Sequence, residues 1–378
     1  MRKVIVATKD TSGCPEFAGN TWVSLQYLLG FERLGIESVW VDLLPPVNPL
    51  KAPHSVDYLL DQFDRTARDF GFHERYCVVY NQGERYAGMG QARLLRAAHE
   101  ADLVLCISGH LQPDSPLMRI PRRAYVDIDP GFTQMWAHEW DMGFDRYNFF
   151  FTTGQNVGRP AFTIPTRGVD WQPILPPVAL DAWPFHLDEG CQRFSTIADW
   201  RGSQEATFNG AAYGGKREEF LRVLHAPQEA NQRVEVALCI GPQDFEDLGL
   251  LDQHQWRIRD PYAVAGDPHS YREFIQYSRA EFSVAKSGYV KSNSGWVSDR
   301  TACYLASGKP ALVQSTGFEG TLPTGSGLLT FTTPEEAIAG MQTINADYVA
   351  QCHAARRLAE QHFNSDVVLG RILEVIGL

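Results

Sequence analysis

The chain has 378 residues, of which 44% are hydrophobic and 21% are charged, a composition typical of a globular protein with room for two domains. Its 34 basic and 45 acidic residues give a net charge of -11, and the basic residues do not cluster beyond pairs. Because an acidic chain repels nucleic-acid phosphates, this charge predicts that nucleic acid is not a partner.

The first part of the chain alternates strand and helix signals. The apolar run at 3–8 predicts a strand, Asn20 is a plausible helix N-cap, Gly35 ends that helix, and a second strand follows at 38–42. A strand–helix–strand unit of about 40 residues predicts parallel pairing with a right-handed crossover. Three later apolar runs continue the predicted sheet, at 103–108, 123–129 and 148–153.

A proline-rich stretch then interrupts the alternation. The segment "WQPILPPVALDAWPF" at 171–185 contains four prolines, which block helix and disfavour an interior strand, so it predicts a semi-rigid connector. After it the alternation of strands and helices restarts. The pattern therefore predicts an α/β protein with two doubly wound, Rossmann-like domains facing a cleft. The expected boundaries are 1–175 for the first domain, 176–190 for the linker, 191–350 for the second domain, and 351–378 for C-terminal helices that could cross back.

The seven cysteines are scattered, and no two form a C-x-x-C pair. This usage predicts reduced thiols in a cytoplasmic protein and argues against a disulfide framework or a zinc site. No apolar run approaches the roughly 20 residues of a membrane-spanning helix, so we expect a soluble protein without a membrane span.

The stretch "KSGYVKSNSGWVSDR" at 286–300 is the most informative part of the second domain. It follows an apolar strand and opens a helix near Val297, so it lies where a doubly wound sheet binds its ligand. Small residues allow backbone N–H groups to approach a ligand, and a helix N-terminus with two lysines adds positive charge. The stretch predicts an anion site, most simply for a diphosphate, and the alternative is a flexible surface loop with solvated lysines. The residues meant are Lys286, Ser287, Gly288, Lys291, Ser294, Gly295, Ser298 and Arg300.

The segment "SGWVSDRTACYLASGKPALVQSTGF" resembles the nucleotide-sugar motif of glycosyltransferases with the two-Rossmann GT-B architecture. The resemblance rests on the end of the motif, where a helix closes and a strand follows; these residues are Ala306, Gly308, Pro310, Ala311 and Leu312. Over nearly its whole length the chain is similar to a group of bacterial GT-B-type sequences. The resemblance implies a nucleoside-diphosphate-sugar donor on the second domain, a small-molecule or natural-product acceptor on the first, and no further cofactor or metal ion.

One position departs from the resemblance. The motif commonly has a glutamate five residues before the helix-ending glycine, where it binds the ribose hydroxyls, and here that position is Cys303. Asp299 lies one helical turn earlier on the same face and could reach a ribose instead. The alternative is that Asp299 only complements the helix dipole.

A second loop joins the expected donor site. The resemblance implies that Gly214, Gly215 and Lys216 face the donor phosphates, and paired glycines before a lysine at a helix start suit this role. The alternative is an ordinary turn. The corresponding loop of the first domain lacks the G-x-G-x-x-G fingerprint of a dinucleotide enzyme, and we interpret Asp42, at the end of the second strand, as structural.

Four residues of the first domain are candidates for the catalytic base. Asp127 and Asp129 end a strand two residues apart before Pro130, and two like charges in a partly buried cleft raise one pKa, which suits a general base. The alternative is a pair of turn-capping aspartates. His110 also ends a strand at this edge, and Glu16 lies in the first loop. Asp129 is the first candidate.

The sequence thus predicts a glycosyltransferase that moves a sugar from a nucleoside-diphosphate sugar to an unspecified acceptor. The alternatives are a non-catalytic relative that binds a nucleotide or sugar, and a sugar-nucleotide epimerase on the same scaffold.

Overall fold

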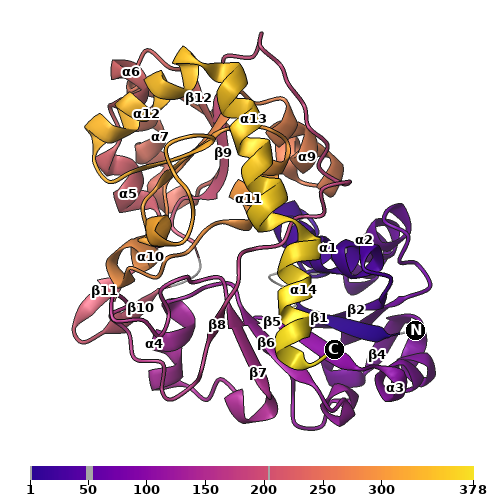
Figure 1. Ribbon diagram of the computed structural model, residues 1–378. Helices are drawn as coiled ribbons and strands as arrows, with labels where there is room; N and C mark the ends of the chain where they lie inside the picture. Colours follow the sequence, from indigo (N-terminus) through magenta and orange to yellow (C-terminus); the bar gives the residue numbers. More distant parts are fainter. Residues whose placement is uncertain (1, 48–53, 203–204) are drawn as a thin grey trace.

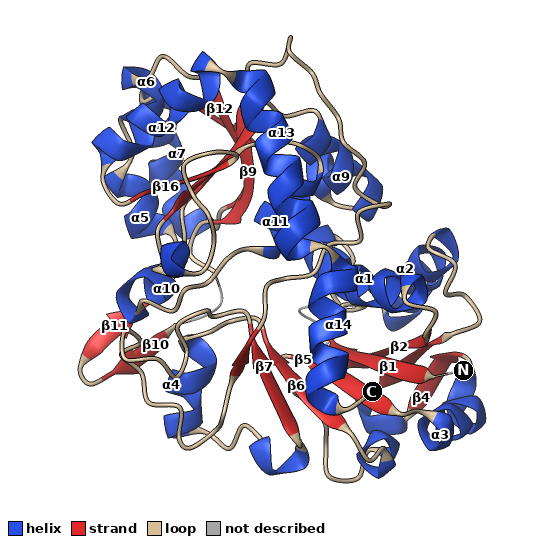
Figure 2. Cartoon of the chain, in the orientation of Figure 1, coloured by secondary structure: helices blue, strands red, loops and turns tan. Residues whose placement is uncertain are grey.

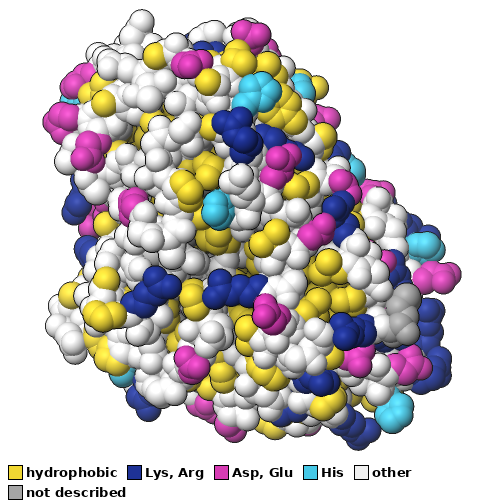
Figure 3. All heavy atoms as spheres, viewed as in Figure 1, with side chains coloured by type: hydrophobic (Ala, Val, Ile, Leu, Met, Phe, Trp, Pro, Cys, Tyr) yellow, Lys and Arg dark blue, Asp and Glu magenta, His cyan; other side chains and the backbone are white. Residues whose placement is uncertain are grey.

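The structure is a computed structural model that describes residues 2–47, 54–202 and 205–378. It has two α/β halves, one below the other in Figures 1 and 2, and each is built on its own sheet. In the view of Figure 3, hydrophobic side chains gather along the waist between the halves, with basic side chains among them.

The first half contains an eight-stranded sheet in the order β4-β3-β2-β1-β5-β6-β7-β8. All neighbouring strands are parallel except β3 and β4, which form an antiparallel pair at one edge. The strands are β1 (Lys3–Lys9), β2 (Glu37–Leu44), β3 (Tyr76–Tyr80), β4 (Arg85–Gly88), β5 (Leu103–Ile107), β6 (Arg123–Asp127), β7 (Phe149–Thr152) and β8 (Gln172–Pro173). The helices of this half are α1 (Ala18–Arg33), α2 (Val56–Asp69), α3 (Gly90–Glu100) and α4 (Phe132–Glu139).

The second half contains a six-stranded parallel sheet in the order β13-β12-β9-β14-β15-β16. Its strands are β9 (Phe194–Asp199), β12 (Val234–Cys239), β13 (Trp256–Arg259), β14 (Ala280–Ser283), β15 (Ala311–Gln314) and β16 (Leu328–Phe331). The first helices are α5 (Arg217–Arg222), α6 (Ala226–Glu229), α7 (Phe245–Gln253), α8 (Pro261–Ala265), α9 (Pro268–Gln276), α10 (Ser287–Ser292) and α11 (Asp299–Ala306). The last helices are α12 (Pro334–Ala346), α13 (Tyr348–Leu358) and α14 (Ser365–Ile376).

A short hairpin, β10 (Ala206–Phe208) and β11 (Ala211–Tyr213), projects from the second half toward α4 of the first (Figure 1). Its turn is Asn209–Gly210, and both residues have positive φ, at 49° and 77°. Asn-Gly is the pair that tight hairpin turns favour, because both central residues must adopt this conformation.

The C-terminal helix α14 packs against α1 and lies over the first sheet, after α13 has followed the second half (Figure 1). The approach is close enough that a Cβ at Gly30 would lie 2.6 Å from Leu369 Cδ1. The proline-rich connector runs beside this passage, where Val178 N donates to Phe363 O and Ser365 N donates to Val178 O. With α9 also against it, α1 is covered on several sides, which explains why most of its residues are buried.

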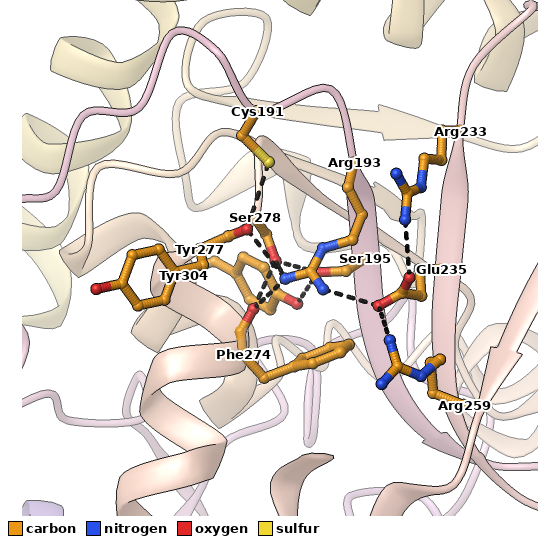
Figure 4. A network of polar contacts seen from close by, with 10 residues as sticks. All are labelled: Cys191, Arg193, Ser195, Arg233, Glu235, Arg259, Phe274, Tyr277, Ser278 and Tyr304. Atoms are coloured by element: carbon orange, nitrogen blue, oxygen red, sulfur yellow. Dashed lines mark hydrogen bonds and ion pairs between the residues drawn. The ribbon is translucent and has the colours of Figure 1, made fainter.

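A polar network centred on the buried carboxylate of Glu235 links strands of the second sheet (Figure 4). Arg193 donates to Glu235, with 2.7 Å between Nη1 and Oε1, and also to the carbonyl oxygens of Phe274 and Tyr277. Arg233 and Arg259 add longer ion pairs to the same carboxylate. Through Glu235 the network joins Arg193, which precedes β9, to β12 and to Arg259, the last residue of β13.

Candidate functional site

A cavity of about 290 Å³ lies between the two halves, at the carboxyl ends of strands from both sheets. The first half contributes residues 16–20 at the start of α1 and Asp129 after β6, and the second contributes Lys216, Lys286 and residues 298–300. The cavity therefore brings together residues that lie up to 284 positions apart in the chain (300 - 16). Four aromatic side chains line part of its wall: Tyr262, Tyr271, Tyr289 and Trp296.

Lys216 is the most unusual side chain of the cavity. Only 6% of it is exposed, and within the described residues it makes no hydrogen bond or ion pair. Burial, reinforced by the positive charges of Arg300 and Lys286, lowers the pKa of Lys216 well below its usual value. A buried ammonium without a partner is costly unless an anion accompanies it, so the cavity is suited to a negatively charged ligand.

The backbone explains how Lys216 reaches this place. A Cβ at Gly215 would lie 1.3 Å from the carbonyl oxygen of Arg201, so only glycine allows the chain to pass there. The residue after this crossing is Lys216, which lines the cavity just before α5 begins. The close crossing at Gly215 thus determines where the next residue, Lys216, lies.

Two further cations of the cavity, Arg300 and Lys286, already have partners. Arg300 donates to Glu281 Oε1 at 2.9 Å and to Ser283 Oγ at 2.6 Å; burial alone would lower its pKa, but the charge of Glu281 raises it overall. Lys286 Nζ lies 3.1 Å from Asp129 Oδ1. These partners orient the two cations, and both remain on the cavity wall.

Asp299 begins α11 and lines the cavity, whereas Cys303 does not. Burial raises the pKa of Asp299, and within the described residues its carboxylate makes no side-chain hydrogen bond. Cys303 is buried on the other side, where its Sγ accepts a bond from Gln26 Nε2 at 3.4 Å. Ser298 caps the helix by accepting from Arg300 N at 3.2 Å. The helix thus presents Asp299, and not Cys303, to a ligand in the cavity.

A second, small cavity of about 20 Å³ lies behind Asp299. Tyr27 OH and Thr153 Oγ1 are buried and have no hydrogen-bond partner among the described residues, and both residues line this cavity together with Asp299. This space is enough for one water molecule, which needs two or more polar partners. Such a water would join the two hydroxyls to the Asp299 carboxylate.

The remaining residues of the predicted anion loop lie outside the main cavity. Ser287 Oγ accepts from Gly214 N at 3.0 Å, and a Cβ at Gly288 would clash with the Phe132 ring. Lys291 is exposed and donates to Ala212 O. The small residues here allow α10 to pack closely against the first half.

Ser294 and Gly295 join the two halves through their backbones. The carbonyl oxygens of Ser294 and Gly295 accept from Asn156 N and Gln155 N, both at 3.1 Å. Gly295 has φ +69°, and a Cβ there would lie 2.9 Å from Asn156 N, so the position requires glycine. Ser294 and Gly295 thus lie in an interface between the two halves and not on the wall of the cavity.

The two aspartates after β6 have different surroundings. Asp127 is fully buried and accepts from Asp129 N, Thr133 Oγ1, Gln134 Nε2 and Thr152 Oγ1 at 2.7–3.0 Å. Burial raises the pKa of Asp127 to about 6. It does not line the cavity and anchors the start of α4. Asp129 lines the cavity and is bound by Lys286 and by the hydroxyl of Tyr289.

Glu16 and His110 also differ in placement. Glu16 lines the cavity and contacts His54 Nε2. His110 lies outside the cavity lining, and burial lowers its pKa to about 4. It is the last of three consecutive residues with positive φ, at 61°, 79° and 87° for Ser108, Gly109 and His110. Among the four predicted base candidates, Asp129 and Glu16 thus lie in the cavity, and Asp127 and His110 do not.

Several cavity residues carried no readable signal in the sequence. Tyr289 lies one helical turn after Lys286, where it donates its hydroxyl to Asp129, and only the fold brings that aspartate near. Arg201 follows β9 and is held by Asp244.

Asp42, expected to be structural, is fully buried and accepts from Thr8 and from the backbone of Ser12.

Among the described residues, no group of three or more His, Cys, Asp or Glu side chains is placed to hold a metal ion. None of the helices in the described ranges has the length and apolarity to cross a membrane. All seven cysteines are free.

No protein-family model matches the sequence, and no curated protein sequence matches it. Solved structures do match over the whole chain. They include an alpha-glucosyltransferase in complex with UDP-glucose and DNA containing an abasic site, with TM-score 0.63, 12% identity, and coverage of 100% of this chain and 99% of that one. Anabaena Alr3699/HepE in complex with UDP and glucose has TM-score 0.56 and 12% identity, with both chains covered fully.

A third match is AviGT4, a glycosyltransferase involved in avilamycin A biosynthesis, with TM-score 0.57, 13% identity, and coverage of 100% of this chain and 97% of that one. These are GT-B glycosyltransferases, and the likeness shows that the chain has the GT-B fold. The fold class predicted from the sequence is therefore confirmed.

The comparison also corrects one prediction. The net charge was expected to exclude nucleic acid, but alpha-glucosyltransferases of this fold form complexes with DNA. The exclusion was wrong because net charge averages over the whole surface, whereas a nucleic acid contacts only the part of the surface that faces it.

Proposed function

We propose that this protein is a glycosyltransferase that transfers a sugar from a nucleoside-diphosphate sugar to an acceptor. The observation that carries the proposal is Lys216, a lysine that is 6% exposed, lines the central cavity and makes no side-chain hydrogen bond or ion pair within the described residues. The diphosphate of a donor would supply the missing anion. The structural neighbours bind UDP or UDP-glucose, which supports a uridine nucleotide as the first donor to test.

In this proposal the donor lies against the second half of the chain. Its diphosphate meets Lys216, Lys286 and the start of α11 near Arg300, and Asp299 receives hydrogen bonds from the ribose hydroxyls in place of the usual glutamate. When the bond to the sugar breaks, negative charge grows on the leaving diphosphate. Cations already fixed around it stabilise this charge without reorganisation, so we propose that neither a metal ion nor a further cofactor is needed.

The acceptor reaches the same cavity from the first half. Asp129 is our first candidate for the base that removes the proton of the acceptor hydroxyl, and Glu16 is the second, because both carboxylates line the cavity. General base catalysis contributes roughly 10²–10⁴-fold to a rate. The free thiols support a cytoplasmic location for this reaction.

A thermal-shift screen of UDP, GDP, ADP and dTDP tests the proposal. A ligand at 100 times its dissociation constant stabilises a protein by about 2.7 kcal/mol. We expect one of the four to protect the parent and to lose this effect in Lys216→Met. Transfer to an acceptor then separates a transferase from an epimerase, which alters the sugar without an acceptor, and from a protein that only binds. The proposal fails if no nucleoside diphosphate protects the parent.

A further inference from the structure

A separate cavity of about 410 Å³ opens beside the donor cavity. The β10–β11 hairpin and the starts of α5 and α10 form one side, and the end of α4 forms the other. Arg201 lines both cavities, while Gly215 faces the larger one and Lys216 the donor cavity. A ligand in the larger cavity would therefore lie next to the proposed diphosphate site. We call it the lateral cavity.

Trp140 gives the lateral cavity an accessible aromatic face. It lines the cavity and is 60% exposed, unlike most tryptophans of the chain. Its ring stacks on Trp136, with 6.2 Å between centroids and 21° between planes, and Trp136 Nε1 donates to Glu205 O. The platform is thus held in place before any ligand arrives. An exposed indole of this kind suits the flat apolar face of a sugar ring.

The charges around the platform are unequal. The basic groups are engaged: Arg201 binds Asp244 through two bonds of 2.6 and 2.7 Å, and Arg217 binds Asp247 through bonds of 2.6 and 2.9 Å. Lys291 donates to a backbone carbonyl oxygen.

The acidic groups of the same cavity are Glu139, Glu205 and Glu218. Within the described residues their carboxylates make no hydrogen bond or ion pair. With Arg201 and Arg217 paired to Asp244 and Asp247, these three carboxylates face one remaining cation of the described part of the chain, Lys291. The lateral cavity therefore offers hydrogen-bond acceptors and net negative charge, which disfavours a phosphate and favours a ligand rich in donors.

We propose that the lateral cavity binds a saccharide ring of the acceptor, stacked on Trp140, with its hydroxyl or ammonium groups donating to the carboxylates. That the bound saccharide is the acceptor rests on the proposed function. The binding of a saccharide to the lateral cavity does not depend on it. The proposal makes the acceptor a carbohydrate. Its sugar-accepting hydroxyl would reach the donor cavity past Arg201, which lines both cavities. A neutral sugar and an amino sugar share this chemistry, and the carboxylates distinguish them.

The test is binding of the full-length protein to an array of neutral and amino-sugar glycans, without donor. We expect the parent to retain a set of glycans, and Trp140→Ala to bind them roughly tenfold or more weakly, since it loses the stacking face. Phe245→Ala, which removes another exposed aromatic ring outside both cavities, is the matched control and should bind like the parent.

Two further variants identify the kind of saccharide. If Glu205→Gln and Glu218→Gln weaken retention of amino sugars, the ligand is cationic; if they matter only for neutral glycans, hydroxyl groups are recognised. The proposal is overturned if the parent retains no glycan, or if Trp140→Ala retains the same glycans as strongly. Protection by UDP is measured on the same samples. Its absence would count against the proposed donor alone, whereas its persistence in Trp140→Ala shows that the variant is folded.

Discussion

Asp129 and Lys286 form an ion pair between the two halves of the molecule, with 3.1 Å between Oδ1 and Nζ. Asp129 follows β6 of the first sheet and Lys286 follows β14 of the second, so the pair joins the carboxyl ends of the two sheets. The hydroxyl of Tyr289 reaches the same carboxylate. One proposed acceptor group and one proposed donor group are thus in direct contact before substrate binds.

The first prediction concerns Asp129→Asn. The side chains of the pair are only 20% and 18% exposed, so removing its negative charge should lower the free energy of unfolding, and activity is compared on the folded variant. The turnover rate should fall roughly 10²–10⁴-fold because the base is lost. Rates at saturating donor and acceptor measure this. Turnover close to that of the parent would contradict the role, and a comparable loss in Glu16→Gln instead would move the role to Glu16.

The second prediction is that Asp127→Asn destabilises the protein without affecting nucleotide binding. The new NH₂ group of the asparagine would face the hydrogen-bond donor of Gln134 or of Thr152, which the carboxylate accepts from in the parent. Two donors that face each other leave a buried polar group unsatisfied, which costs about 1–3 kcal/mol. Urea unfolding of variant and parent gives this difference.

The same pair of proteins tests the pKa of Asp127. Because burial raises this pKa to about 6, the folded parent binds a proton that the unfolded chain has lost, and its stability falls as pH rises toward 6. The deficit of Asp127→Asn should therefore be larger at pH 5 than at pH 7.5, by about 1.4 kcal/mol per unit of pH below 6. A deficit that does not depend on pH would contradict the assignment.

The third prediction is that His110→Gly is tolerated. A φ of 87° strains any residue except glycine, so the variant should stay within about 1 kcal/mol of the parent at pH 7. Burial lowers the pKa of His110 to about 4, so the parent loses stability as pH falls from about 6.5 to 4, and the variant should lack this part of the loss. Turnover should be unchanged; a loss of 10²-fold or more would make His110 the base.

How far the sequence could predict the site depends on the range of the contacts. Gly215 and Lys216 were predicted together to face the donor phosphates; the structure places Lys216 on the donor cavity and Gly215 on the cavity beside it, and their role in binding stays a prediction. Gly295 was assigned to phosphate binding, yet the structure places it against Asn156, 139 positions earlier (295 - 156), and no local pattern reports such a contact.

Two other cases show the same limit. Two aspartates at i and i+2 resemble a matched pair, but β6 ends at Asp127 and the chain then turns, so only Asp129 enters the cavity. The β10–β11 hairpin was missed although the pair Asn209–Gly210 signals such a turn. The strand and helix pattern was readable because burial on both faces of the sheets leaves continuous apolar runs.

The fourth prediction concerns Asp299→Asn. Burial raises the pKa of Asp299, so ionising this carboxylate costs stability as pH rises; the variant, which cannot ionise, should unfold at a higher temperature than the parent at pH 7.5. It should bind UDP more weakly, because it loses acceptors for the ribose, while affinity for pyrophosphate should be almost unchanged. Isothermal titration calorimetry of variant and parent with UDP and with pyrophosphate measures both affinities. Equal losses for the two ligands would indicate a helix-terminus effect and exclude the ribose role.

The central claim is that the cavity at Lys216 binds the diphosphate of a donor. The most direct measurement is the melting temperature of Lys216→Met with and without UDP, beside Lys309→Met as matched control. Lys309 is also buried, and its Nζ has no hydrogen-bond partner in the part of the chain that the structure describes, but it does not line the cavity. We predict that both variants melt at or above the temperature of the unliganded parent, since each removes a buried amine. Only Lys216→Met should lose protection by UDP. Full protection of Lys216→Met by UDP, or equal loss in both variants, would contradict the claim.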